Sequence, residues 1–206
     1  MDRVNGFRRC TITVVLVAIN IGYLIFMYAT GSVQNSQLAV EYGALYGPAV
    51  IEGHQYYRLV TAMFMHFGVG HLFGNMILLY ALGRIIEEEL GKIKYVAVYL
   101  LSGIVGNIVS VIYYMSRSVN AVSAGASGAV FGLVGVILWL IIVNHGQYKG
   151  INIFRILLMI AFALYSGWTG SGINNAAHVA GLVTGFVLGA AFIGKGCRSE
   201  NDRFYC

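Results

Sequence analysis

A serine, two histidines and an asparagine are the residues best suited to chemistry. Ser127 stands in the string Gly125-Ala126-Ser127-Gly128, and His178 lies near the start of the last apolar segment. A serine hydroxyl is a weak nucleophile until a neighbouring base accepts its proton, and histidine is the usual base. The pair predicts attack of Ser127 on an acyl carbon, with His178 as general base.

His71 and Asn75 are candidates for stabilising the charge that develops in such a reaction. They are four residues apart, so on a helix they share one face. Two hydrogen-bond donors aimed at one point are what an oxyanion hole requires. The alternative is that the two groups satisfy each other. Ser127 alone could equally be a helix N-cap, and His178 a hydrogen-bonded packing residue.

Other hydrolytic chemistries lack their residues. Aspartate occurs only as Asp2 and Asp202, so neither paired aspartates nor a Ser-His-Asp triad is available in the apolar segments. No His-Glu-x-x-His string is present. Three histidines could still hold zinc, but His66 and His71 are five apart, a poor spacing for one helical face. A serine–histidine dyad remains, and no metal or cofactor is indicated.

The elements that must position these residues are membrane helices. Of 206 residues, 58% are hydrophobic and 10% charged, whereas average soluble domains carry about 25% charge. A span needs about 20 mostly apolar residues. We predict an all-α polytopic membrane protein with one integral domain over residues 1–206. Its six predicted transmembrane helices cover about residues 11–30, 71–88, 93–115, 127–144, 151–168 and 174–194.

Charge sets the predicted topology. Eleven of the 13 lysines and arginines fall in alternate loops on one side, and only Arg58 and Arg117 fall on the other. The positive-inside rule then places both termini in the cytoplasm and residues 31–70 outside, as a long structured loop in the interface. The formal charge of +5 thus reflects topology, so we expect the lipid bilayer, not nucleic acid, as partner.

Glycine patterning links the fourth and sixth predicted spans. Gly128-x-x-x-Gly132 and Gly181-x-x-x-Gly185 place small residues four apart, which lets helix backbones approach closely in lipid. Generic packing could explain this pattern, but the candidate nucleophile and base head the two stripes. Because spans two, four and six all begin outside, the reactive residues should lie at similar depth.

Three strings together resemble the signature of the rhomboid family of intramembrane serine proteases, over about residues 40–194. They are His66-x-x-x-x-His71-x-x-x-Asn75, Gly125-Ala126-Ser127-Gly128 and Ala177-His178-x-x-Gly181-x-x-x-Gly185. The resemblance implies an endopeptidase that cuts transmembrane protein substrates in or near their spans. It implies that Ser127 is the nucleophile and that His178 is first base and then acid.

The resemblance also implies supporting roles. His71 and Asn75, with the backbone N–H of Ser127, would bind the oxyanion. His66 would support the first external loop, and Gly181 would allow close contact between spans six and four. A further residue, Glu87, matches an acidic position that the family uses for stability.

Two positions depart from the family pattern. Tyr57-Arg58 stands where many members have Trp-Arg, and Phe131 stands where some members have a tyrosine stacked on the histidine. Both departures keep an aromatic ring, although Phe131 cannot donate a hydrogen bond. We expect them to change stability or rate rather than the chemistry.

Hydrolysis within a bilayer requires water, so we expect a cavity open to the outside. Residues 116–126 should descend to Ser127 as irregular backbone, which is tolerated only beside protein or a watery cavity. Residues 164–175, with Gly167, Gly170, Gly172 and Trp168, are expected to form a mobile cap.

Three other functions remain open at this point. A rhomboid-like pseudoprotease would bind membrane proteins without cutting them, but such proteins typically lose the serine or the histidine. A transporter or channel that relays protons would carry ionisable residues through the depth of the membrane, whereas here they gather in the outer third. A structural assembly factor would leave the alignment of serine and histidine unexplained.

Overall fold

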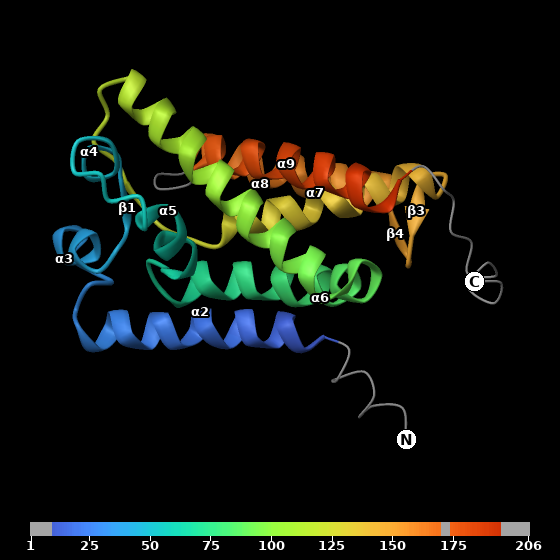
Figure 1. The fold of residues 1–206 in the computed structure, drawn as a ribbon, viewed down its shortest axis with the longest axis horizontal. Helices are drawn as coiled ribbons and strands as arrows, with labels where there is room; N and C mark the ends of the chain where they lie inside the picture. The colour runs from blue at the N-terminus through green and yellow to red at the C-terminus, as the bar shows by residue number, and fades with distance from the viewer. Residues whose placement is uncertain (1–9, 170–173, 195–206) are drawn as a thin grey trace.

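The computed structural model describes residues 10–169 and 174–194, and in them the predicted apolar segments are helical (Figure 1). The long helix α6 is divided at Gly91, whose φ of 76° lies in the region that glycine adopts without penalty. The chain therefore turns between the second and third predicted spans. The long helices are α2 (Thr11–Ala29), α6 (Val69–Ser116), α7 (Ser127–Val143), α8 (Ile153–Thr169) and α9 (Asn175–Ile193).

Three of these helices, α2, α6 and α9, are long and apolar enough to cross a membrane, and α7 and α8 are apolar but shorter. Large apolar side chains point outward, among them Ile25 on α2 and Phe154 and Phe162 on α8. Exposed apolar surface of this extent is typical of helices surrounded by lipid. The helical class of the prediction is confirmed, whereas the count of six spans stays a prediction.

Helix α7 is the centre of the bundle and packs directly against α9. A methyl group added at Gly181 would collide with the carbonyl oxygen of Gly128, and one at Gly185 would collide with that of Gly132. Only glycine permits such close backbone contact. The predicted packing of the fourth segment on the sixth is confirmed.

The segment between α2 and α6 folds at one end of the bundle (Figure 1). Strand β1 pairs antiparallel with β2, with Leu45 opposite Ser123. This pairing ties the loop to the stretch that leads into Ser127, so residues 116–126 are not wholly irregular. The short elements are α3 (Ser36–Glu41), β1 (Leu45–Tyr46), α4 (Gly47–Ile51), α5 (Arg58–Thr61), the 3-10 helix η1 (Ala62–Phe64) and β2 (Val122–Ser123).

Arg58 organises the interior of this loop. Its side chain is buried, and its guanidinium donates to the carbonyl oxygens of Val40 and Ala44 and to the side-chain oxygen of Gln55. A buried charge is tolerated when it has such partners. The exposed Tyr57 ring lies 5.3 Å from the guanidinium carbon, so the Tyr57-Arg58 pair holds the loop from within and covers the charge from outside.

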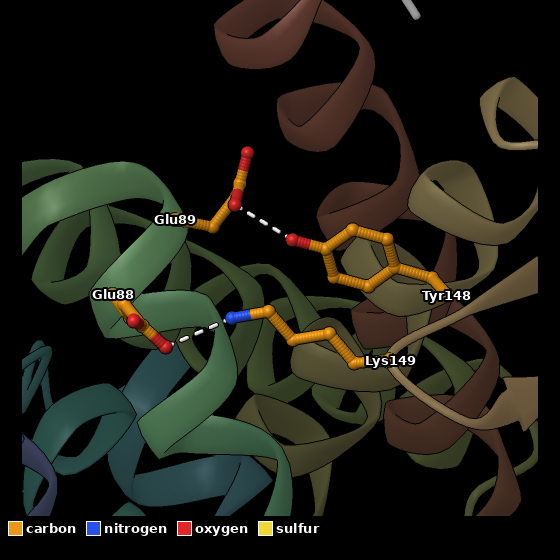
Figure 2. Close-up of polar contacts among 4 residues, drawn as sticks. All are labelled: Glu88, Glu89, Tyr148 and Lys149. Carbon is orange, nitrogen blue, oxygen red and sulfur yellow. Dashed lines mark hydrogen bonds and ion pairs between the residues drawn. The ribbon is translucent and has the colours of Figure 1, made fainter. Parts of the chain in front are cut away.

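The opposite end of the bundle carries a hairpin formed by β3 (Gln147–Tyr148) and β4 (Ile151–Asn152). Figure 2 shows how it is held to α6: the Tyr148 hydroxyl donates to Glu89 at 2.6 Å, and Lys149 Nζ lies 2.8 Å from Glu88. These contacts fix the connection between α7 and α8 to the end of the first part of α6.

The preceding glutamate, Glu87, holds a different element. Its carboxylate is buried and accepts hydrogen bonds from the backbone N–H groups of Ile12 and Thr13 and from the Thr13 hydroxyl, at 2.9, 2.8 and 2.8 Å. It thereby satisfies N–H groups that a helix start leaves without partners, where negative charge is also favoured. Glu87 thus docks the start of α2 on α6.

Candidate active site

Ser127 is the first residue of α7, and the loop before it bends at Gly125. The φ of Gly125 is 143°, which favours glycine, and a methyl group there would lie 2.9 Å from Nε2 of His71 and 3.8 Å from Oγ of Ser127. The absence of a side chain at Gly125 therefore leaves the space between the serine hydroxyl and the His71 ring open.

His178 lies in the first turn of α9 and is 6% exposed. Its ring stacks on Phe131, with 4.3 Å between ring centroids and 4° between ring planes. Phe131 is one helical turn after Ser127 on α7, so the histidine ring covers the first turn of the helix that carries the serine. The close glycine contacts between α7 and α9 make this approach possible.

A cavity of about 580 Å³ joins these residues. Its volume is within the range of about 300–1,000 Å³ typical of ligand pockets. Ser127 and His178 line it, as do His71 and Asn75 from the first turns of α6. The structure thus brings together all four residues that the sequence singled out for chemistry. Other lining residues are Phe67, Gly70, Gly74, Leu78, Asn107, Ser123, Ala163, Ser166 and Asn174.

The two oxyanion-hole candidates do not satisfy each other through their side chains. The Asn75 amide donates to the backbone carbonyl of His71 at 3.0 Å, within the helix. An amide nitrogen has two hydrogens, so one N–H of Asn75 is left over beside the cavity. His71 also lines the cavity, with its ring near Gly125.

His66 is fully buried and contacts the loop that leads into Ser127. Its Nε2 accepts a weak hydrogen bond, at 3.5 Å, from the backbone N–H of Ala126, and its ring meets that of His71 edge-on at 5.0 Å. Burial, reinforced by the neighbouring His71, lowers the pKa of His66 to about 3, so the ring is neutral and can accept. The support of the external loop that the resemblance implies for His66 stays a prediction.

His178 has no acidic partner in the described part of the chain. Its Nδ1 is buried and makes no hydrogen bond to any residue in 10–169 or 174–194. The same residues hold no group of three histidine, cysteine or acidic side chains close enough together to bind a metal ion. Ser127 and His178 share the cavity with His71 and Asn75, whose side chains can donate hydrogen bonds.

Asn174 is a cavity residue that sequence reasoning missed. Its side chain joins the start of α9 to Ser110 and Ser123. The only sequence signal was an asparagine just before an apolar segment, which reads as an ordinary helix cap. Of the predicted mobile cap, residues 164–169 belong to α8, and Gly170 and Gly172 lie outside the described residues.

The cavity that joins a serine and a histidine thus lies among apolar helices of the kind that cross membranes. The Rhomboid domain family model matches residues 53–195, so the chain belongs to the rhomboid family and is a multi-pass membrane protein.

Curated relatives agree with this assignment. The chain is 30% identical over 181 residues to Rhomboid protease GluP of Bacillus subtilis (strain 168), covering 88% of this chain and 34% of that protein. It is 39% identical over 149 residues to RHOMBOID-like protein 4 of Arabidopsis thaliana, covering 71% and 36%. Against Putative rhomboid protease YdcA of Bacillus subtilis (strain 168), identity is 34% over 151 residues, covering 73% and 72%. The chain thus spans only about a third of the length of the first two relatives.

Proposed function

We propose that the chain is an intramembrane serine endopeptidase that hydrolyses peptide bonds in or near the transmembrane segments of other membrane proteins. The observation that carries the proposal is the meeting of Ser127 and His178 on one cavity, with the histidine ring stacked one helical turn after the serine. Membership of a family whose members include named proteases supports the same activity.

In the first half of the reaction, Ser127 Oγ attacks the scissile carbonyl carbon while its proton passes to His178. The carbonyl oxygen becomes negative and is stabilised by His71, Asn75 and the N–H of Ser127. Because Ser127 opens α7, that N–H has no acceptor within the helix. The C–N bond then breaks, His178 gives the proton to the leaving amine, and an ester remains on Ser127.

In the second half, a water molecule from the cavity attacks the ester carbon. His178 removes its proton, the same donors stabilise the oxyanion, and the C–O bond to Ser127 breaks. The proton on His178 returns to Ser127 Oγ, which releases the carboxylic acid product and restores the dyad. The cavity supplies the space for this water in a protein otherwise surrounded by lipid.

The substrates we propose are membrane proteins whose helix can unwind near the external face. A peptide bond within a regular helix is shielded, so the segment must become extended before Ser127 can reach its carbonyl carbon. Small or helix-weakening residues lower the cost of this step. The cavity is lined in part by Gly70, Gly74 and Ala163, whose side chains are absent or small. Such walls leave room for an extended backbone to enter.

The topology we propose has six spans, both termini in the cytoplasm and a cavity that opens to the external side. A C-terminal green fluorescent protein fusion should fluoresce, and a C-terminal alkaline phosphatase fusion should be inactive. The reverse pattern would contradict the charge-based orientation.

The activity can be tested with purified protein in mild detergent and a single-span reporter that carries a small residue and a glycine near its external end. Wild type should cut the reporter once, as read by product mass, and Ser127→Ala and His178→Ala should not. Cleavage that survives Ser127→Ala would remove Ser127 as nucleophile. Binding of several reporters without cleavage by wild type would favour a pseudoprotease.

A further inference from the structure

No carboxylate in the described part of the chain orients the His178 ring. In a Ser-His-Asp triad the buried acid accepts from Nδ1 and fixes the imidazole, but here Nδ1 has no partner within the described residues 10–169 and 174–194. The ring's position therefore depends on Phe131, on which it stacks, and on how the first turn of α9 is held. We propose that Asn174 holds that turn as a positioning residue for His178, an inference that rests on the proposed protease function.

The Asn174 side chain uses both of its polar atoms. Its Oδ1 accepts from the backbone N–H of Ala177 at 3.1 Å, which caps α9. Its Nδ2 donates to the hydroxyl of Ser110 and lies 3.4 Å from the hydroxyl of Ser123. One side chain thus joins three elements: the start of α9, the second part of α6 and strand β2.

These contacts connect the proposed base to the proposed nucleophile. The backbone N–H of His178 donates to the Asn174 carbonyl at 3.1 Å, so the two residues share the first turn of α9. Ser123 is four residues before Ser127 in the loop that leads into α7. Ser110 is fully buried and gives the amide a fixed anchor.

Backbone packing and hydrogen bonds restrain the start of α9 in different ways. The start of α9 is wedged between two glycines: a methyl group at Gly106 would lie 2.9 Å from the Ala177 carbonyl oxygen, and one at Gly128 would lie 3.5 Å from it. These contacts limit how closely the start of α9 can approach α6 and α7. Hydrogen bonds are directional, so the Asn174 contacts set the rotation and axial position of the turn that carries His178.

Loss of this restraint should affect turnover more than substrate binding. A misplacement of about 1 Å at a catalytic group can cost roughly a hundredfold in rate. We expect Asn174→Ala to lower kcat by roughly tenfold to a hundredfold, with KM within about twofold of wild type because every other side chain that lines the cavity is kept.

Two variants separate the contact of Asn174 with Ser110 from its capping of α9. Asn174→Ser keeps an oxygen that can cap the helix but is too short to reach Ser110, and Ser110→Ala removes the anchor and leaves the cap. A matched control is Asn152→Ala, which removes a cap at the far end of the bundle, where Asn152 accepts from the backbone N–H of Arg155 at 2.9 Å.

The experiment measures kcat and KM for the single-span reporter, the rate of labelling by a fluorophosphonate, and thermal unfolding, with the full chain in mild detergent. The inference predicts that Asn174→Ala, Asn174→Ser and Ser110→Ala all lower kcat and the labelling rate of the folded protein by tenfold or more, while Asn152→Ala, which also loses a helix cap, keeps both rates at the wild-type level. It is overturned if Asn174→Ser recovers wild-type kcat, or if the losses merely follow the folded fraction. A wild type that neither cuts the reporter nor is labelled would instead overturn the proposed function itself, and the inference with it.

Discussion

The rings of Phe131 and His178 lie parallel, 4.3 Å apart between centroids, and join α7 to α9 directly above the first turn of α7. Aromatic pairs of this kind contribute about 0.5–1.5 kcal/mol beyond their buried area. If the stack holds the base in its reactive place, its loss should cost up to about tenfold in rate. Phenylalanine provides the stack without a hydroxyl, so we expect the ring face, not a hydroxyl, to position His178.

Phe131→Leu should therefore lower kcat by about three- to tenfold with little change in KM, whereas Phe131→Tyr should stay within about threefold of wild type. Reporter cleavage kinetics check both. Phe186→Leu is the matched control, because Phe186 on α9 also makes an aromatic pair, with Trp139, away from the cavity. Equal losses from Phe131→Leu and Phe186→Leu would show that stacking on His178 has no special role.

Gly181→Ala should destabilise the bundle and reduce activity, since the added methyl group meets the backbone carbonyl of Gly128, which cannot rotate away. Forced separation of packed helices costs about 1–3 kcal/mol, and it would also move His178 away from Ser127. Unfolding in mixed micelles and reporter cleavage measure the two effects.

The control for Gly181→Ala is Gly22→Ala on α2, where nothing lies within 4 Å of the added methyl group. Alanine there should leave stability unchanged or raise it by up to about 1 kcal/mol, because glycine is the poorer helix former. A tolerated Gly181→Ala would contradict the close packing of α7 on α9.

Glu87→Gln should destabilise the protein by about 1–3 kcal/mol, because one of the two carboxylate oxygens that accept from the partly buried Ile12 and the buried Thr13 becomes an amide donor. Glu88→Gln is the control: its ion pair with Lys149 is half-exposed and should be worth less than about 1 kcal/mol. Comparable effects of the two substitutions on unfolding would contradict the docking role of Glu87.

His66 should make the protein less stable in acid. Burial holds the pKa of His66 at about 3 in the fold, against about 6.5 in an unfolded chain. Between these pH values His66 is protonated in the unfolded chain but neutral in the fold. The stability that the neutral His66 contributes is therefore lost progressively as the pH falls from about 6.5 toward 3, with a slope of up to about 1.4 kcal/mol per pH unit.

The measurement is unfolding in mixed micelles at several pH values between these limits. His66→Gln should lower stability near neutral pH, because the Ala126 N–H loses its imidazole acceptor, and it should reduce the slope of stability against pH. Parallel slopes for wild type and His66→Gln would show that this histidine does not titrate as its burial requires.

The helices could be predicted from the sequence because each is a continuous local signal. The bounds of α2, α7, α8 and α9 fall close to the predicted apolar segments, and the break in α6 falls at Gly91 between two of them. The proximity of the four chemically suited residues could also be predicted, since the alternating topology expected from the sequence places the starts of spans two, four and six on one side. The length of the apolar runs and the distribution of charge were sufficient for both inferences.

Long-range polar contacts were beyond this reasoning. The contact of His66 with Ala126 and that of Asn174 with Ser110 each join residues about 60 positions apart, and no local pattern marks either pair. The interior role of Arg58 depends on the fold of a loop whose elements are only two to six residues long, below the length at which periodicity is informative. These contacts follow from packing, so they appear only with the structure.

Covalent labelling of Ser127 tests the central claim most directly. The full chain would be incubated with a fluorophosphonate in mild detergent, digested and mapped by mass spectrometry, alongside His178→Ala and Ser127→Ala. The proposed dyad predicts a single adduct on Ser127 in wild type, slowed at least a hundredfold in His178→Ala and absent in Ser127→Ala. An adduct on another serine, or labelling of Ser127 that does not depend on His178, would contradict it.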